Sequence, residues 1–187
     1  MKYKLKEVVV SKICLIIGHG GNDGGAFNKS TKETELNYNR DLASKLQKEL
    51  TDKGFLVDIY NRGFNKSENV DYLNKVGYDI LISLHCNAYN GIATGTEVLY
   101  WNTSRKGKEL SQYLLDNIVK ALGLKNRGLK PIKNGDRGAY LLGKTKPVCV
   151  LLEPFFMDND DDLKVGNEKK NDYIKAIVDS CISYFKK

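Results

Sequence analysis

Apolar runs of strand length recur along the chain. The run Ile13–Ile17 is continuous, which fits a strand buried on both faces better than one with a solvated face. Further segments with strand character are 55–60, 79–84, 95–101 and 147–152. A short segment at 138–143 is expected to form another strand or a turn. This pattern predicts about six strands.

Helical patterns separate these strands. Residues 33–53 carry an apolar stripe that Gly54 ends, and residues 104–122 carry another, from a Ser104 cap to Gly123. A short helix is expected over 68–76, and a terminal helix over about 167–185. The alternation predicts an α/β fold with one mostly parallel, twisted sheet flanked by helices.

Length and composition favour a single domain. The chain has 187 residues, 41% hydrophobic residues and 3 Pro, which is typical of a globular unit. We expect residues 1–187 to form that domain, with 1–12 as an N-terminal extension and no linker to a second module. No apolar run approaches the roughly 18 residues of a membrane span, and 1–12 lacks the apolar core of a signal peptide. Synthesis in the cytoplasm is therefore expected.

The charge balance leaves several partners open. Lys+Arg 30 against Asp+Glu 23 gives +7, which suits nucleic acid, a polyanionic cell wall or a membrane surface. The basic residues are spread out and lack interleaved aromatics, which favours a solvated face used for solubility or steering. The 4 Cys show no CxxC spacing and are expected to be reduced core residues.

Side chains that can bind a metal or transfer a proton lie where three predicted apolar strands end. His19, His85 and Glu153 each follow such a strand, and the chain contains only 2 His. The carboxyl ends of parallel strands share one edge of a sheet, so these side chains should converge. Glu33, at the start of the first helix, can return to that edge. Two imidazoles with a carboxylate form the donor set of a catalytic zinc with an open position.

Several other residues near these strand ends have more than one interpretation. The run Gly18–Gly25 lacks both the P-loop signature and the GxGxxG spacing. Asp23 is expected either to accept a proton from a ligand histidine or to shape the glycine-rich turn. Asn87 is a candidate substrate contact, with loop capping as the stronger alternative. Four aromatic residues favour packing over a sugar platform: Tyr100, Trp101, Phe155 and Phe156.

Four blocks of the sequence resemble one enzyme family. They are Ile17–Ala26, Glu33–Asn37, Ser83–Ala88 and Leu151–Asn159. Together they are similar to the four blocks of the zinc-dependent N-acetylmuramoyl-L-alanine amidases of the amidase-3 type, in the family's order. The resemblance extends over about residues 13 to 185 and so covers nearly the whole chain.

The resemblance implies a set of site residues. One Zn²⁺ would be bound by His19, Glu33 and His85, and Glu153 would be the catalytic carboxylate. Glu33 is preferred to Glu35 because the family's ligand lies four residues before the helix asparagine, here Asn37, and Glu35 is then expected to face solvent. Pro154 departs from the small residue that usually follows the catalytic glutamate.

The resemblance also implies a substrate. The enzyme would hydrolyse the amide between N-acetylmuramic acid and L-alanine in peptidoglycan. Without a signal peptide or wall-binding module, the chain resembles a phage or prophage endolysin that reaches the wall after release, or a truncated cellular amidase. No inserted inhibitory helix is evident between His85 and Glu153, so the site should be open. We expect a monomer with peptidoglycan as partner, no nucleic acid and no membrane span.

Two alternatives remain. One is a zinc peptidase or deacetylase acting on another wall bond, because the metal donors do not specify the substrate. The other is a basic nucleic-acid-binding module whose histidines are structural.

Overall fold

A six-stranded sheet organises the part of the chain that the computed structural model describes, residues 10–65 and 67–186. Its spatial order is β2-β1-β3-β6-β4-β5, and every neighbouring pair is parallel except β4 and β6. The strands are β1 (Lys12–Ile17), β2 (Leu56–Asn61), β3 (Ile80–Leu84), β4 (Thr96–Trp101), β5 (Asn126–Ile132) and β6 (Val148–Glu153). This confirms the expected α/β fold with a mostly parallel sheet. Of the expected extension 1–12, residues 1–9 lie outside the described residues, whereas Lys12 begins β1.

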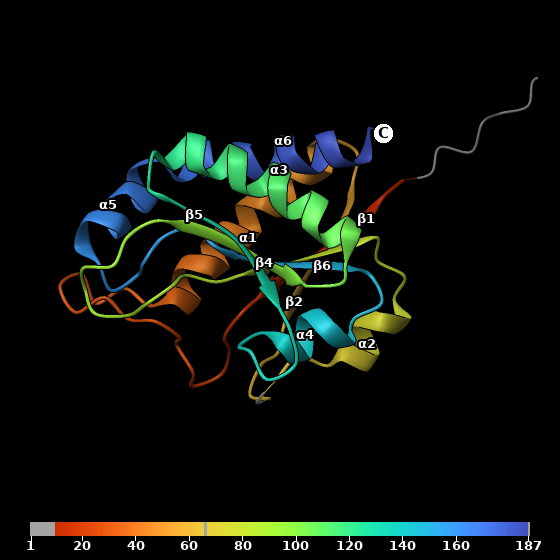
Figure 1. Ribbon diagram of the computed structural model, residues 1–187, viewed down its shortest axis with the longest axis horizontal. Coiled ribbons are helices and arrows are strands. Elements are labelled where there is room, and N and C mark those ends of the chain that lie inside the picture. Colours follow the sequence, from red (N-terminus) through yellow and green to blue (C-terminus); the bar gives the residue numbers. More distant parts are fainter. Residues whose placement is uncertain (1–9, 66, 187) are drawn as a thin grey trace, which may run out of the picture.

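Helices cover both faces of the sheet (Figure 1). α1, α3 and α6 lie over one face, and the short helices α2 and α4 lie over the other. The bounds are α1 (Glu35–Asp52), α2 (Val70–Lys75), α3 (Arg105–Leu122), α4 (Ala139–Lys144), α5 (Asp160–Glu168) and α6 (Lys170–Phe185). No helix in the described ranges combines the length and apolar character that a bilayer span requires.

The continuous apolar run of β1 reflects this double coverage. Successive side chains of a strand point to opposite faces. Ile13 and Leu15 accordingly belong to the larger core under α1, α3 and α6, whereas Cys14 and Ile16 belong to the smaller core under α2 and α4. The four cysteines are buried and form no disulfide, as expected.

Three elements differ from the sequence expectation. The basic connection after α3 contains β5, which lies at the edge of the sheet. The segment expected to be a strand or turn at 138–143 forms α4 instead, and α5 precedes the terminal helix, which begins at Lys170. The sheet has six strands because β5 replaces the strand expected at 138–143.

The register of the central strands determines where the site forms. β1, β3 and β6 are consecutive in the sheet and parallel. Ile17 pairs with Leu84, and Leu84 pairs with Leu152, so the three strands end at the same level. The residues that follow them meet at one edge of the sheet.

Candidate active site

His19 and His85 are placed by an extension of the strand ladder. The amide of Gly18 donates to the carbonyl of Leu84 at 3.1 Å, and the amide of His85 donates to the carbonyl of Leu152 at 3.1 Å. A Cβ at Gly18 would lie 2.1 Å from Cε1 of the His85 ring. Glycine at position 18 is therefore what allows this imidazole to lie against the end of β1.

Glu35 is the carboxylate that the fold brings to the two histidines. It is the first residue of α1, directly after the N-cap Thr34, and it is 1% exposed. Its Oε2 accepts from the amide of Ala26 at 2.8 Å, and its Oε1 accepts from the amide of Cys86 at 2.9 Å. These amides hold the carboxylate in one orientation.

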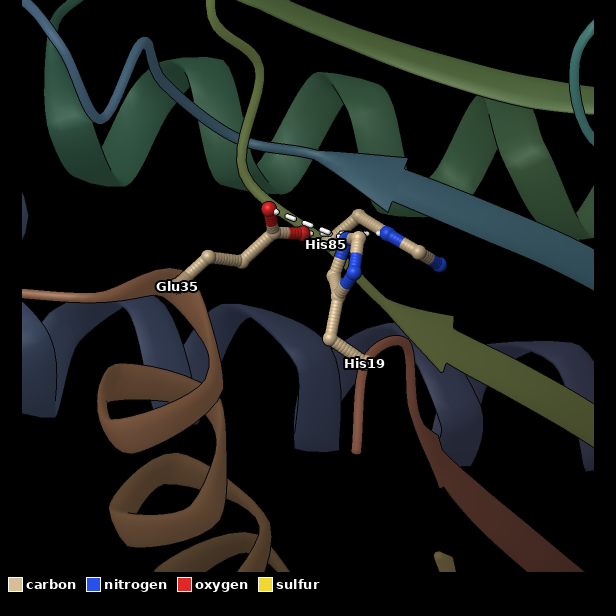
Figure 2. Close-up of side chains that lie close together, drawn as sticks. All are labelled: His19, Glu35 and His85. Carbon is tan, nitrogen blue, oxygen red and sulfur yellow. Dashed lines mark hydrogen bonds and ion pairs between the residues drawn. The ribbon is translucent and has the colours of Figure 1, made fainter. Parts of the chain in front are cut away.

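The three side chains point toward one another from separate segments (Figure 2). Nδ1 of His85 lies 3.0 Å from Oε1 of Glu35, and Nε2 of His19 lies 3.2 Å from Oε2. One ligand-type atom from each residue lies within 4.8 Å of the other two. The group thus has the separations of a metal-binding set.

This geometry corrects the expectation for the two nearby glutamates. Glu33 is not part of the group, and Glu35, expected to face solvent, is buried within it. Glu33 precedes the N-cap, and its backbone carbonyl accepts from the amide of Asn28 at 2.9 Å in the preceding loop. The helix begins at Glu35, so the side chain at position 35, and not the one at position 33, starts the helix at the edge of the sheet.

The charges of the group are mutually stabilising. Burial alone would raise the pKa of Glu35, but the contacts with His19 and His85 outweigh it and hold that pKa well below its usual range. The contact with Glu35 is the main reason that the pKa of His19 rises to about 8, although burial opposes the change. The carboxylate is therefore ionised and ready to act as a ligand.

The residues present fit a metal ion. Nε2 of His19 is buried and lacks a well-directed hydrogen bond in the described structure, although it faces Glu35. Two imidazole nitrogens and one carboxylate oxygen are a donor set used by catalytic transition-metal sites.

Glu153, the last residue of β6, brings a second carboxylate to the same edge. It is 2% exposed, and its Oε1 accepts from Nη2 of Arg137 at 3.0 Å, whereas its Oε2 is buried without a partner in the described structure. Burial raises the pKa of Glu153 to about 8, and Arg137 limits the rise. A carboxyl group that titrates in this range is suited to proton transfer.

Arg137 was not found from the sequence. It lies in the turn between β5 and α4 and is exposed. Nothing in the pattern around an exposed arginine in a turn indicates that it reaches a strand end, so no sequence signal identifies it.

The two remaining candidates occupy different positions. Asp23 Oδ2 lies 2.9 Å from Nδ1 of His19 and also contacts the guanidinium of Arg62. Its Oδ1 accepts from the amide of Gly25 at 3.1 Å, so Asp23 both contacts a site histidine and shapes the glycine-rich turn. Asn87 donates to Glu97 Oε1 at 2.8 Å.

The expected packing role of the aromatic residues is confirmed. Tyr100, Phe155 and Phe156 are buried, and Trp101 packs against the smaller core.

A cavity of about 390 Å³ gives access to the site. The side chains of His19 and His85 retain 20% and 11% exposure. Of the helices between His85 and Glu153, α3 packs over the larger core, and residues of α4 border the cavity.

The fold and the site define an α/β protein with a candidate metal centre at the carboxyl edge of its sheet. The chain belongs to the N-acetylmuramoyl-L-alanine amidase family, Amidase_3, whose model matches residues 13–183.

Individual relatives support this assignment. The chain is 31% identical over 162 residues to an uncharacterized cell wall amidase of Bacillus anthracis, covering 79% of this chain and 30% of that protein. It is 26% identical over 192 residues to the N-acetylmuramoyl-L-alanine amidase LytC of Bacillus subtilis, covering 98% and 37%. The chain thus spans about a third of the length of these curated relatives. The solved catalytic domain of the CD27L endolysin targeting Clostridia difficile aligns with a TM-score of 0.79 and 32% identity, over 92% of this chain and 97% of that domain.

Proposed function

We propose that this protein is a zinc-dependent hydrolase of the amide between N-acetylmuramic acid and L-alanine in peptidoglycan. One observation carries the proposal: the group His19, Glu35 and His85 lies at the same sheet edge as Glu153, which has a buried oxygen without a described partner. Membership of the amidase family supports the choice of bond.

His19, Glu35 and His85 would hold the ion. When bound, Zn²⁺ would polarise the amide carbonyl and lower the pKa of a water molecule beside it. Asp23, through its contact with Nδ1 of His19, would place the proton of that ring on Nδ1 and leave Nε2 facing Glu35. The amides of Ala26 and Cys86 keep the carboxylate of Glu35 fixed.

Glu153 would move the proton. Its Oε2 is available to accept a proton from the attacking water and to deliver one to the leaving amine. Arg137 holds Oε1, which fixes the orientation of the carboxyl group and stabilises its charged form.

The biological role proposed is that of a cell-wall lytic enzyme of the endolysin type. The support is the likeness to a solved endolysin catalytic domain, nearly all of which this chain covers. Purified protein added to cells or isolated walls would then lower their turbidity. Walls that remain intact while soluble muropeptides are cleaved would contradict the lytic role and leave the amidase role standing.

The bond can be identified from the products of digestion. Mass analysis of digested peptidoglycan should find new α-amino groups on peptides headed by L-alanine, without new reducing sugar ends. Shorter peptides would indicate a peptidase, loss of acetyl groups a deacetylase, and cleaved glycan strands a glycosidase. A chelator should abolish the activity, and zinc should restore it.

Substitution of Glu153 separates binding the metal from using it. Glu153→Gln keeps nearly the same shape but removes the acid, so activity should fall by about 10²–10⁴-fold. Zinc content should change little, because the three metal donors are untouched. Loss of zinc from this variant would place Glu153 among the ligands and contradict its assignment to proton transfer.

A further inference from the structure

The cavity beside the two histidines contains an exposed cation. Arg137 lines it together with His19 and His85, and Tyr140 of α4 forms part of its wall. The side chain of Arg137 is 60% exposed, although its Nη2 donates to Glu153. A guanidinium carries five N–H donors, so this single contact leaves most of its donors available to the cavity.

The turn that carries Arg137 is held by its own hydrogen bonds. The Oδ2 of Asp136 accepts from the amide of Lys133 at 2.9 Å, and the carbonyl of Asp136 accepts from the amide of Ala139 at 3.1 Å. Gly138 follows with a φ of 81°, a conformation that favours glycine. Arg137 therefore projects from a defined turn between β5 and α4.

Among the described residues, Glu153 is the one carboxylate that forms an ion pair with Arg137. Asp23 is engaged by His19, Arg62 and the amide of Gly25, and Asp136 is engaged within its turn. Glu68, in the segment before α2, also lines the cavity and is half-buried. Arg137 thus remains an exposed donor group beside the site.

We propose that Arg137 binds a carboxylate of the substrate's peptide and so determines specificity on the peptide side of the bond. The inference rests on the proposed amidase function, in which the leaving group is the amine of an alanine that begins a peptide. A guanidinium matches a carboxylate through two parallel hydrogen bonds, a geometry that an amide or a hydroxyl does not reproduce. The cavity would therefore discriminate between peptides that carry a free carboxylate near the alanine and peptides in which it is amidated.

Two short peptides test the inference directly. L-alanyl-D-glutamine and its α-amide differ only in that a carboxamide replaces the α-carboxylate, and neither carries a γ-carboxylate. Titration calorimetry on the zinc-loaded protein should give an affinity about tenfold higher for the peptide with the free α-carboxylate, the size expected of a charge-assisted hydrogen bond at a partly exposed site.

Three variants separate recognition from a supporting role. Arg137→Gln should reduce the preference to less than about twofold, and Arg137→Lys should retain part of it, because the charge remains but the fork is lost. Arg105→Gln changes an exposed arginine at the start of α3, outside the cavity lining, and should leave the preference unchanged. Zinc content and melting temperature verify that each variant is folded.

The outcomes are decisive. Equal affinities in the unmodified protein, binding of neither peptide, or tighter binding of the amide would overturn the inference; the last result would mean that Asp23, Glu68 and Asp136 dominate the cavity. If Arg137→Gln lost the same affinity for both peptides, Arg137 would only position Glu153 and would not recognise the carboxylate. The titration does not depend on cleavage. A preference that persists when muramoyl peptides are not cleaved would refute the amidase function and leave the carboxylate subsite supported.

Discussion

Glu33 and Glu35 are separated by one residue, yet the fold gives them different surroundings. Glu35 begins a helix, and its carboxylate meets the amide of Ala26, from the loop before α1, and the amide of Cys86, from the segment after β3. Those donors come from distant parts of the chain, and the sequence does not reveal that they converge. His19, His85 and Glu153 could be placed from the sequence because each lies within two residues of the end of a strand, whereas Glu35 depends on the exact start of a helix.

The two glutamates provide a matched pair of variants. Glu35→Gln removes the anionic donor between the histidines and should weaken zinc binding by at least about tenfold. Glu33→Gln makes the same chemical change outside the group and should leave zinc content and activity nearly unchanged. Metal analysis of both purified variants is the measurement. The reverse result, with zinc lost on changing Glu33 and kept on changing Glu35, would show that the helix start seen here does not set the ligand.

The burial of Glu153 makes a prediction about stability and pH. Its pKa is about 8 in the folded protein, against an ordinary value of 4.5. Below the ordinary value both states are protonated; as the pH rises toward the folded value, the unfolded chain loses this proton first, so the stability contributed by Glu153 is lost. Glutamine does not titrate. We therefore expect the melting temperature of metal-free Glu153→Gln, relative to that of the metal-free unmodified protein, to rise by a few degrees as the pH increases from about 5 to about 8.

The difference between the two proteins is the quantity to measure. His19 also has a raised pKa, but it is present in both proteins, so its titration largely cancels in the comparison. A difference in melting temperature that stays constant across this range would mean that Glu153 is ionised throughout.

At the scale of elements, buried strands were easier to predict than exposed ones. β1, β3 and β6 are apolar runs because both of their faces are covered, and that pattern is visible in the sequence. β5 was missed because it contains Gly128 and Pro131 and is mostly half-exposed, which an edge strand tolerates. α4 has six residues, too few to display a helical period, and the polar residues of α5 hide its short apolar stripe.

Two helix caps test whether the start of α1 matters to the metal site. Thr34 accepts from the amide of Asn37 at 3.3 Å at the start of α1, and Ser104 accepts from the amide of Gly107 at 3.0 Å at the start of α3. Thr34→Ala and Ser104→Ala should each cost about 1 kcal/mol of unfolding free energy. Thr34→Ala should also lower zinc affinity, because Glu35 is the next residue, whereas Ser104→Ala should not. Denaturant titration gives the unfolding free energy, and zinc competition gives the zinc affinity. Equal zinc affinities for the two variants would show that the cap of α1 does not affect the metal ligand.

At the scale of the whole molecule, the net charge of +7 is expected to act on the approach to an anionic wall. Salt screens such long-range attraction, so the rate on whole walls should fall several-fold between low salt and about 0.5 M salt. The rate on a small soluble muropeptide should fall less. A neutral osmolyte at matched osmolality serves as the control. If the rates on both substrates fell equally with salt, the net charge would not speed the approach to the wall.

The position of β6 links the completion of the sheet to the completion of the site. Among the described strands, β6 is the one that joins β2-β1-β3 to β4-β5, and it is also the last in the sequence. Contacts between segments so far apart along the chain form late, because a long loop must close first. A chain growing from the ribosome would therefore expose two unjoined parts of a sheet and both histidines before β6 arrives. The strand that joins the two parts also delivers Glu153, so a polypeptide cut short before it would lack the acid and the central pairing together.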